Sequence, residues 1–172
     1  SAPRVVPGIK LRCTSETREP GGGGVNVARA ISQLGGHARA VVALAGPNGM
    51  ALETLLKGRN LDLIRVEAPS ETRHSFAVTD EQSGEQYRFV MAGPDWTEAH
   101  LTTVLQTIHT EAPDDALVVF SGSMPPGAPV GFLPRACEAL GTRRVLIDTS
   151  GAHLTHQASG PAPTPHVLRL DR

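Results

Sequence analysis

Apolar and polar residues alternate in three segments of the chain. Residues 9–14, 73–79 and 85–91 each place apolar side chains on one face and polar side chains on the other. Alternation with a period of two predicts β-strands in a sheet that is covered on one side only. A polar turn at 80–84 separates the last two segments, so we expect a β-hairpin over residues 72–91.

Nearly continuous apolar runs form a second pattern, and helical patterns alternate with them. The predicted strands are 38–44, 116–120 and 144–147, and the predicted helices are about 49–57, 97–109 and 130–140. Strands of this kind are buried on both faces by helices, which is typical of a parallel sheet. We therefore expect an α/β core built on a parallel sheet, into which the partly exposed β-strands are inserted.

Glycines at 21–24 open directly into an amphipathic helix, which Gly35 and Gly36 end. The helix residues that can face a core are Val25, Val27, Ile31 and Leu34. Glycine lets the backbone come close to a ligand, and the first turn of a helix has N–H groups without partners in the helix. The junction is therefore suited to bind an anion or a hydroxyl group.

Two other interpretations of the glycines exist. A dinucleotide-binding loop of the Rossmann type needs a buried strand before the glycines and an acidic residue about 20 residues after them. Residues 9–19 have mixed polarity, and the strand at 38–44 runs into the uncharged residues 45–48, so neither requirement is met. An ordinary glycine-rich loop is the second alternative.

The predicted parallel strands end in similar polar segments. These segments are 45–48, 121–127 and 148–151, and each combines small, hydroxylated or acidic residues with glycine or proline. Any one of them is typical of a turn. Ligands of parallel α/β sheets bind beyond the carboxyl ends of the strands, so the three segments together indicate a polar cleft.

Three side chains in these segments and strands are candidates for ligand binding. Ser123 lacks the surroundings of a catalytic nucleophile, because Ser-Gly-Ser-Met-Pro is no G-x-S-x-G elbow, and a hydrogen bond to a ligand hydroxyl suits it better. Lys10 and Arg73 lie on predicted exposed strands. They are either solvated surface charges or contacts for a phosphate group.

Composition excludes several classes of function. The 172 residues carry a formal net charge of −1 with dispersed basic residues, which argues against a nucleic-acid partner. No apolar stretch reaches the 18 or so residues of a membrane span and no signal-peptide pattern is present, so we expect a cytoplasmic protein without membrane contact. Cys13 and Cys137 are predicted to be reduced thiols, and His153 and His156 to be loop residues rather than metal ligands.

Several motifs carry a resemblance to a known family. They are Gly8–Cys13, Pro20–Ala30, Leu34–Gly36, Glu71–Arg73, Gly84–Met91, Ser121–Gly127 and Asp148–Gly151. From about residue 6 to residue 151, the order of these motifs and the residues within them resemble those of the ribokinase-like PfkB family of carbohydrate kinases. The nearest resemblance is to the ATP-dependent 6-phosphofructokinase branch. The four-glycine run favours this branch over the 1-phosphofructokinases and tagatose-6-phosphate kinases, which usually have lysine among these glycines.

The resemblance implies a fold and a division of the chain. The fold would be a Rossmann-type parallel sheet flanked by helices, with a small β-sheet lid that also joins two copies into a homodimer. Residues 1–172 would form part of a PfkB-type kinase domain. Lid strands would lie at about 9–18 and 61–91, and the α/β core at about 20–60 and 92–172.

The resemblance also implies roles for individual residues in the transfer of a phosphoryl group from ATP, with Mg²⁺, to the 1-hydroxyl of fructose 6-phosphate. Gly22, Gly23 and Asn26 would hold the sugar hydroxyls, Lys10 and Arg73 the 6-phosphate, and Ser123 the substrate as well. Asp148 would lie on the side of ATP and magnesium, and no metal ligands are predicted beyond it.

Two family motifs are not found in the chain. Members of the family begin with a strand that ends in Asn-Pro-Ala-x-Asp, and their second half holds a Gly-Ala-Gly-Asp motif with the catalytic base. The resemblance therefore predicts an incomplete core, no catalytic base among these residues, and no kinase turnover by an isolated 172-residue piece. The alternative is a non-catalytic module that binds a sugar phosphate or forms dimers.

Overall fold

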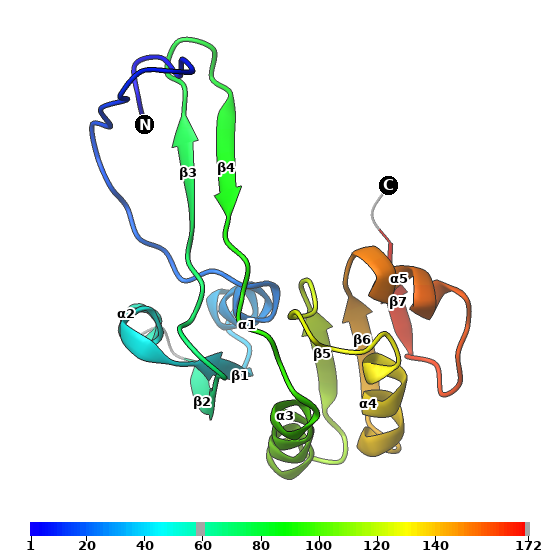
Figure 1. The fold of residues 1–172 in the computed structure, drawn as a ribbon. Helices are drawn as coiled ribbons and strands as arrows, with labels where there is room; N and C mark the ends of the chain where they lie inside the picture. The colour runs from blue at the N-terminus through cyan, green and yellow to red at the C-terminus, as the bar shows by residue number, and fades with distance from the viewer. Residues whose placement is uncertain (58–60, 171–172) are drawn as a thin grey trace.

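The computed structural model describes residues 1–57 and 61–170, in which helices and strands alternate along most of the chain (Figure 1). The helices are α1 (Gly23–Gln33), α2 (Gly46–Leu56), α3 (Glu98–Glu111), α4 (Phe132–Leu140) and α5 (Gly151–Ala158). The strands are β1 (Arg39–Leu44), β2 (Asp62–Glu67), β3 (Ser75–Thr79), β4 (Gln86–Val90), β5 (Leu117–Ser121), β6 (Arg144–Asp148) and β7 (Val167–Arg169).

Five of the strands form parallel pairs, as predicted for an α/β core. β1 pairs with β2, and Val41 lies opposite Ile64. The second parallel sheet has the order β5-β6-β7, with Ile147 opposite Leu168. Within the described residues these are two sheets rather than the single sheet that we expected, because the apolar patterns do not specify which strand edges meet.

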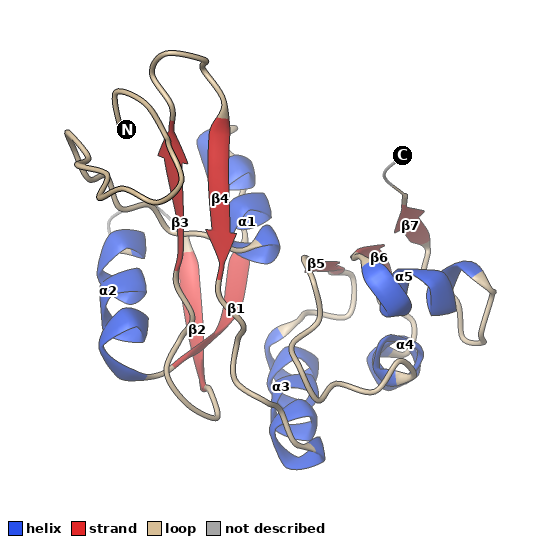
Figure 2. Cartoon of the chain, turned by 45° about the horizontal axis from the view of Figure 1, so that its top comes forward, coloured by secondary structure: helices blue, strands red, loops and turns tan. Residues whose placement is uncertain are grey.

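Two helices contact both parts of the parallel core. α1 contacts β1 of one sheet and β5 of the other, and α3 contacts β1 and β2 as well as α4. Figure 2 shows the two groups of strands with the helices around them. The two sheets are therefore held next to each other by helix packing.

The largest apolar cluster lies where α3, α4 and β6 meet. Its buried residues are Leu101, Leu105, Phe132, Leu133, Ala136, Cys137, Leu140, Val145 and Ile147. Apolar residues of α4 at spacings of three and four line one face of the helix, so one side of α4 is buried. This cluster supports the sheet from which the polar strand ends project.

A β-hairpin projects from the core, as the alternation over 72–91 predicted. β3 and β4 are antiparallel, and the rings of the opposed residues Phe76 and Phe89 stack with their centroids 4.8 Å apart. Both rings are nearly half exposed, at 49% and 45%. Figure 1 shows the hairpin extending away from the helices and the parallel strands.

The predicted strand at 9–18 is wrong, because these residues form no ladder with a neighbour. Residues 1–14 form an irregular N-terminal arm that contacts the hairpin tip, where the Val5 N–H donates to Asp80 Oδ2 at 2.8 Å. Asp80 Oδ1 also accepts from the Gln82 and Ser83 N–H groups, at 2.9 and 3.1 Å. Alternation of side chains gives a strand only where a second strand supplies hydrogen bonds.

Residues 61–67 do not belong to the lid in which we expected them. β2 pairs in parallel with β1, and its residue Val66 is buried. The resemblance placed this segment in the lid, but its pairing with an apolar strand places it in the core. The projecting β-structure is therefore confined to the hairpin and the arm that contacts it.

Two smaller expectations also differ from the structure. His153 and His156 lie in α5 rather than in a loop, although the segment is rich in residues that favour turns. Leu34 is 88% exposed, because it follows the last turn of α1, and Val25 and Ala28 are the buried residues of that helix. In the described parts of the chain, no helix is long and apolar enough to cross a membrane.

Candidate functional site

The glycine run lies against the end of β5. Gly22, the residue before α1, has φ +113°, a conformation that favours glycine. A Cβ placed on Gly23 would lie 2.6 Å from the backbone carbonyl of Ser121, so only glycine fits there without a shift. Gly122, with φ +109°, faces the Gly23 amide from the other side. The first turn of α1 therefore meets the carboxyl end of β5 at backbone contact.

Asp148 links the carboxyl ends of three strands. Its Oδ2 accepts hydrogen bonds from Ser121 Oγ of β5 at 3.1 Å and from Arg169 Nη1 of β7 at 3.0 Å. Its backbone carbonyl accepts from the Gly122 N–H at 2.8 Å. Because β5, β6 and β7 are parallel, these polar ends meet at one edge of the sheet. This confirms the prediction for 121–127 and 148–151, but the third predicted segment, 45–48, follows β1 of the other sheet.

Ser123 lies just beyond this edge. Its hydroxyl is 3.1 Å from the Ser150 hydroxyl, in the segment that follows β6. The same two segments are joined by a hydrogen bond from Thr149 Oγ1 to the Gly122 carbonyl at 3.0 Å. The loops after β5 and β6 are thus tied together, and they place Ser123 on the same rim as Gly22, Gly23 and Asp148.

Arg73 approaches this rim from the hairpin. A Cβ placed on Gly93 would lie 3.5 Å from Arg73 Cδ and 4.0 Å from Pro126 Cδ, so the stem of Arg73 runs past residues near the Ser123 loop. The side chain is exposed, and it makes no ion pair or side-chain hydrogen bond with any described residue. Its guanidinium is available for a ligand.

Asn26 faces solvent in the first turn of α1. Its Oδ1 accepts from Arg29 Nη1 at 3.3 Å, and Arg29 Nη1 also donates to the carbonyl of buried Pro20 at 3.0 Å. Arg29 therefore holds both the start of the glycine run and the side chain of Asn26, which we expected to bind sugar hydroxyls.

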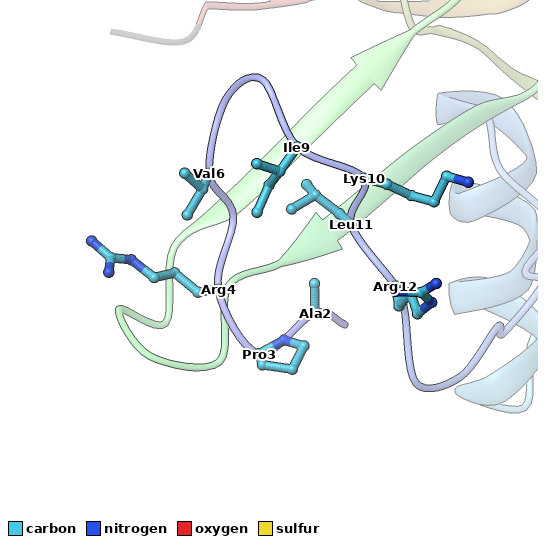
Figure 3. Close-up of a pocket in the computed structure, with 8 residues that line it drawn as sticks. All are labelled: Ala2, Pro3, Arg4, Val6, Ile9, Lys10, Leu11 and Arg12. Carbon is cyan, nitrogen blue, oxygen red and sulfur yellow. The ribbon is translucent and has the colours of Figure 1, made fainter.

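Lys10 lies in the N-terminal arm, among residues 2–12. It lines an open hollow of about 350 Å³ formed by the N-terminal arm (Figure 3). Figure 3 shows Lys10 and Arg12 pointing to one side of this hollow and Arg4 to the opposite side. Within residues 1–57 and 61–170, no hydrogen bond or ion pair joins the side chains of Lys10, Asn26, Arg73 and Ser123 to one another.

Three residues of the rim were not predicted as site residues from the sequence. Ser121 and Arg169 contact Asp148, and Ser150 contacts Ser123. Ser121 and Ser150 could have been found, because both lie in the polar segments at strand ends. Arg169 could not have been found, because β7 has only three residues and no apolar run that would predict a strand.

The paired histidines of α5 show no metal-binding arrangement. Burial, and next to it the charge of His156, lowers the pKa of His153. In the parts of the chain that the structure describes, no three His, Cys, Asp or Glu side chains gather closely enough to hold a metal ion.

Comparisons with known proteins match this architecture to one family. The family described as pfkB family carbohydrate kinase matches residues 3–169. The ATP-dependent 6-phosphofructokinase isozyme 2 of Escherichia coli strain K12 is 41% identical over 155 residues, which are 89% of this chain and 50% of the relative. A 1-phosphofructokinase of Xanthomonas campestris pv. campestris is 30% identical over 173 residues, covering 98% of this chain and 54% of the relative.

A solved structure agrees with the sequence matches. The crystal structure of E. coli phosphofructokinase-2 in complex with fructose 6-phosphate superposes with a TM-score of 0.85 at 39% identity, over 92% of this chain and 52% of that one. The chain thus spans about half the length of the curated relatives it matches. The family match covers nearly all of the chain, and the superposition confirms the expected ribokinase-like α/β fold. The chain belongs to the pfkB family of carbohydrate kinases.

Proposed function

We propose that the full gene product carrying this chain is a sugar-phosphate kinase that transfers a phosphoryl group from ATP to the 1-hydroxyl of fructose 6-phosphate. The observation that carries the proposal is the contact between the first turn of α1 and the end of β5, beside Asp148. This arrangement offers amide N–H groups to a ligand at the same sheet edge as a carboxylate. Family membership and the 41% identity to a 6-phosphofructokinase support the choice of substrate.

The substrate would lie on the rim formed by the glycine run and the Ser123 loop. In this proposal Gly22, Gly23 and Asn26 bind the sugar hydroxyls, and Ser123 donates a further hydrogen bond. Arg73 is suited to the 6-phosphate, because guanidinium groups bind phosphate oxygens in bidentate fashion and this one has no described partner. Lys10 as a second phosphate contact stays a prediction, since its described neighbours belong to the N-terminal arm.

Asp148 is the residue that fits a role on the nucleotide side. Proteins usually bind Mg²⁺ through one or two carboxylates together with substrate phosphates, so a single half-buried carboxylate is a suitable donor set. Ser121 and Arg169 both bond Oδ2 and so fix the orientation of this carboxylate. Mg²⁺, when bound, would neutralise charge on the phosphate oxygens. Phosphoryl transfer depends mainly on alignment and charge neutralisation, and both depend on such fixed groups.

We also propose that the hairpin mediates a homodimer. Phe76, Tyr87, Phe89 and Val90 expose apolar surface on two paired strands, and exposed apolar patches of this kind mark interaction sites. Replacing Phe76 and Phe89 together by serine should shift the molar mass in light scattering from dimer to monomer. Met50→Ser, at an exposed apolar residue of α2, is the control and should leave the mass unchanged.

The test of function compares ligands and turnover. Thermal-shift titrations of the full gene product with fructose 6-phosphate, fructose 1-phosphate and tagatose 6-phosphate rank the three by RT ln(1 + [L]/Kd). We expect the largest shift with fructose 6-phosphate, and ATP-dependent formation of the bisphosphate in a coupled assay. A larger shift with fructose 1-phosphate would instead favour a 1-phosphofructokinase, which the 30% identity to such an enzyme makes the second candidate.

Two further outcomes bear on the alternatives. Stabilisation by fructose 6-phosphate without turnover, in an assay where a known kinase is active, would indicate the non-catalytic binding module. No stabilisation by any of the three sugar phosphates at millimolar concentration would contradict the proposal. The cytoplasmic location stays a prediction, and fractionation of the native cells would test it.

A further inference from the structure

The hairpin is joined to the core by residues 71–74, which we call the hairpin root. Thr72 at its centre makes three hydrogen bonds to the start of α2. Its N–H donates to the Ala45 carbonyl at 3.0 Å, and its Oγ1 accepts from the Ala45 N–H at 2.9 Å. Its carbonyl accepts from Asn48 Nδ2 at 3.0 Å. The backbone and the hydroxyl of Thr72 are therefore all held by residues 45 and 48.

Glu71 adds a fourth bond from the same root. Its Oε1 accepts from the Asn48 N–H, in the first turn of α2, at 2.8 Å. A carboxylate at this place is favoured by the positive end of the helix dipole. Gly46, with φ +66°, makes room for it, because a Cβ at residue 46 would collide with the Glu71 carboxylate.

Arg73 contrasts with the two residues before it. Glu71 and Thr72 are fixed to α2, whereas the Arg73 guanidinium has no partner among the described residues. Its stem lies beside Gly93, on the side of the loop that holds Pro126. The structure thus combines a fixed backbone with a charged group that has no partner among the described residues.

We propose that Asn48, Glu71 and Thr72 are positioning residues that hold Arg73 ready for the phosphate group of the sugar substrate. The inference rests on the proposed function, and it gives a positioning role to three residues that would not contact the substrate themselves. A residue whose backbone is already ordered loses less conformational freedom when its side chain binds a ligand. Loosening the hairpin root should therefore weaken phosphate binding while Arg73 itself stays unchanged.

A purely structural role makes a different prediction. If the hydrogen bonds only attach the hairpin to the core, their loss should lower stability and affect all ligands alike. If they position Arg73, their loss should matter only for ligands that carry the phosphate, and only while Arg73 is present. Binding of fructose, which has the same hydroxyl pattern without the phosphate, separates the two roles.

The experiment uses the full gene product with the variants Asn48→Ala, Thr72→Val and Arg73→Ala. Dissociation constants for fructose 6-phosphate come from calorimetry, and those for fructose from saturation-transfer NMR. Thr54→Val is the matched control, because the Thr54 hydroxyl bonds the Met50 carbonyl within α2 and lies outside the root. Thermal melting checks that each variant folds, and hydrogen exchange of the Thr72 amide reports directly on the root.

We expect Arg73→Ala to weaken fructose 6-phosphate binding by about 10- to 100-fold, the range of a charge-assisted hydrogen bond. Asn48→Ala and Thr72→Val should each weaken it by roughly 3- to 10-fold, with faster Thr72 exchange in Asn48→Ala and unchanged fructose binding. Added to Arg73→Ala, either root substitution should change the constant by less than about twofold, since coupled residues are non-additive. Thr54→Val should bind both ligands as the unsubstituted protein does.

Three results would overturn the inference. One is a fructose 6-phosphate constant that stays within twofold in both root variants while Arg73→Ala weakens binding, which leaves the proposed function intact. The second is a root effect that persists in the Arg73→Ala background or that extends equally to fructose. The third is binding that is unaffected by Arg73→Ala, which removes the phosphate contact from the proposed function as well.

Discussion

The contact between α1 and β5 can be tested with two neighbouring glycines. Gly23 and Gly24 both lie in the first turn of α1, but only Gly23 touches β5. A Cβ on Gly23 would lie 2.6 Å from the Ser121 carbonyl, where ordinary contacts begin at 3.4 Å, so restoring an ordinary contact in Gly23→Ala requires a shift of 0.8 Å (3.4 − 2.6) between helix and strand. A Cβ on Gly24 meets no atom within 4 Å.

The two substitutions should have opposite effects on stability. Replacing glycine by alanine in a helix gains up to about 1 kcal/mol, so Gly24→Ala should be neutral or stabilising. Overpacking costs roughly 1–3 kcal/mol, so Gly23→Ala should be less stable than Gly24→Ala by about that amount. For a protein of this size each kcal/mol corresponds to about 2–4 °C in Tm.

Urea unfolding followed by the fluorescence of Trp96, the single tryptophan, gives the free energies of both variants. The backbone N–H of Trp96 donates to the Pro126 carbonyl at 2.8 Å, so this probe reports on the loop beyond β5. We also expect weaker fructose 6-phosphate binding in Gly23→Ala alone. Equal unfolding free energies for the two variants would refute the close approach of α1 to β5.

Other features of the structure give further predictions. Leu133→Ala, at a residue with no exposed surface, should lower the unfolding free energy by about 2–5 kcal/mol, whereas Leu34→Ala at the exposed end of α1 should change it by less than about 0.5 kcal/mol; thermal melting compares them. Hydrogen bonds from backbone N–H groups, chiefly that of Val5, lower the pKa of Asp80, so the stabilisation they give is present above the carboxyl's unfolded pKa and is lost as the pH falls through its lowered value. Protection of the Val5 amide, meaning the slowing of its exchange relative to the intrinsic rate at the same pH, should fall below about pH 4 and should not change with acid in Asp80→Asn; the same acid-dependent loss of protection in that variant would contradict the assignment. Burial raises the pKa of the Cys137 thiol while Cys13 is exposed, so a thiol reagent should label Cys13 alone in the native protein and both residues in urea, as mass spectrometry of peptides can show.

Patterns that reflect burial were sufficient to predict most of the core. The apolar runs at 116–120 and 144–147 became β5 and β6, and the alternation over 72–91 became the hairpin. Each of these elements buries or exposes a whole face, so the polarity of its side chains follows from its surroundings and can be used to predict them. Two of the three predicted polar strand ends, 121–127 and 148–151, meet at one edge because β5 and β6 pair in parallel, whereas 45–48 follows β1 of the other sheet and bonds Thr72.

Pairing partners and short elements could not be predicted in the same way. Residues 9–14 alternate like a strand but find no neighbour, and residues 62–67, which the resemblance placed in the lid, pair with β1. Both outcomes depend on residues far away in the sequence. α5 and Arg169 were missed because the short helix and the three-residue strand gain their order from contacts rather than from their own composition.

In the candidate site, the sequence predicted the groups at strand ends better than those on long side chains. Gly22, Gly23, Ser123 and Asp148 share one rim, since their positions follow from the backbone. The roles assigned to these four residues stay predictions, as do those of Asn26, Arg73 and Lys10. For the last three even the placement is hard to predict, because a flexible side chain can reach several places from one backbone position.

The bonds between the N-terminal arm and the hairpin tip have a mechanical consequence. Ala2 pairs with Asp80, and the Val5 N–H bonds the same side chain, so the first residues of the chain are fastened to the far end of the hairpin. Any swing of β3 and β4 about their root would carry the N-terminal arm, and with it Lys10, while Arg73 stays at the root beside α2. The separation between these two positive charges would then change with the angle of the hairpin.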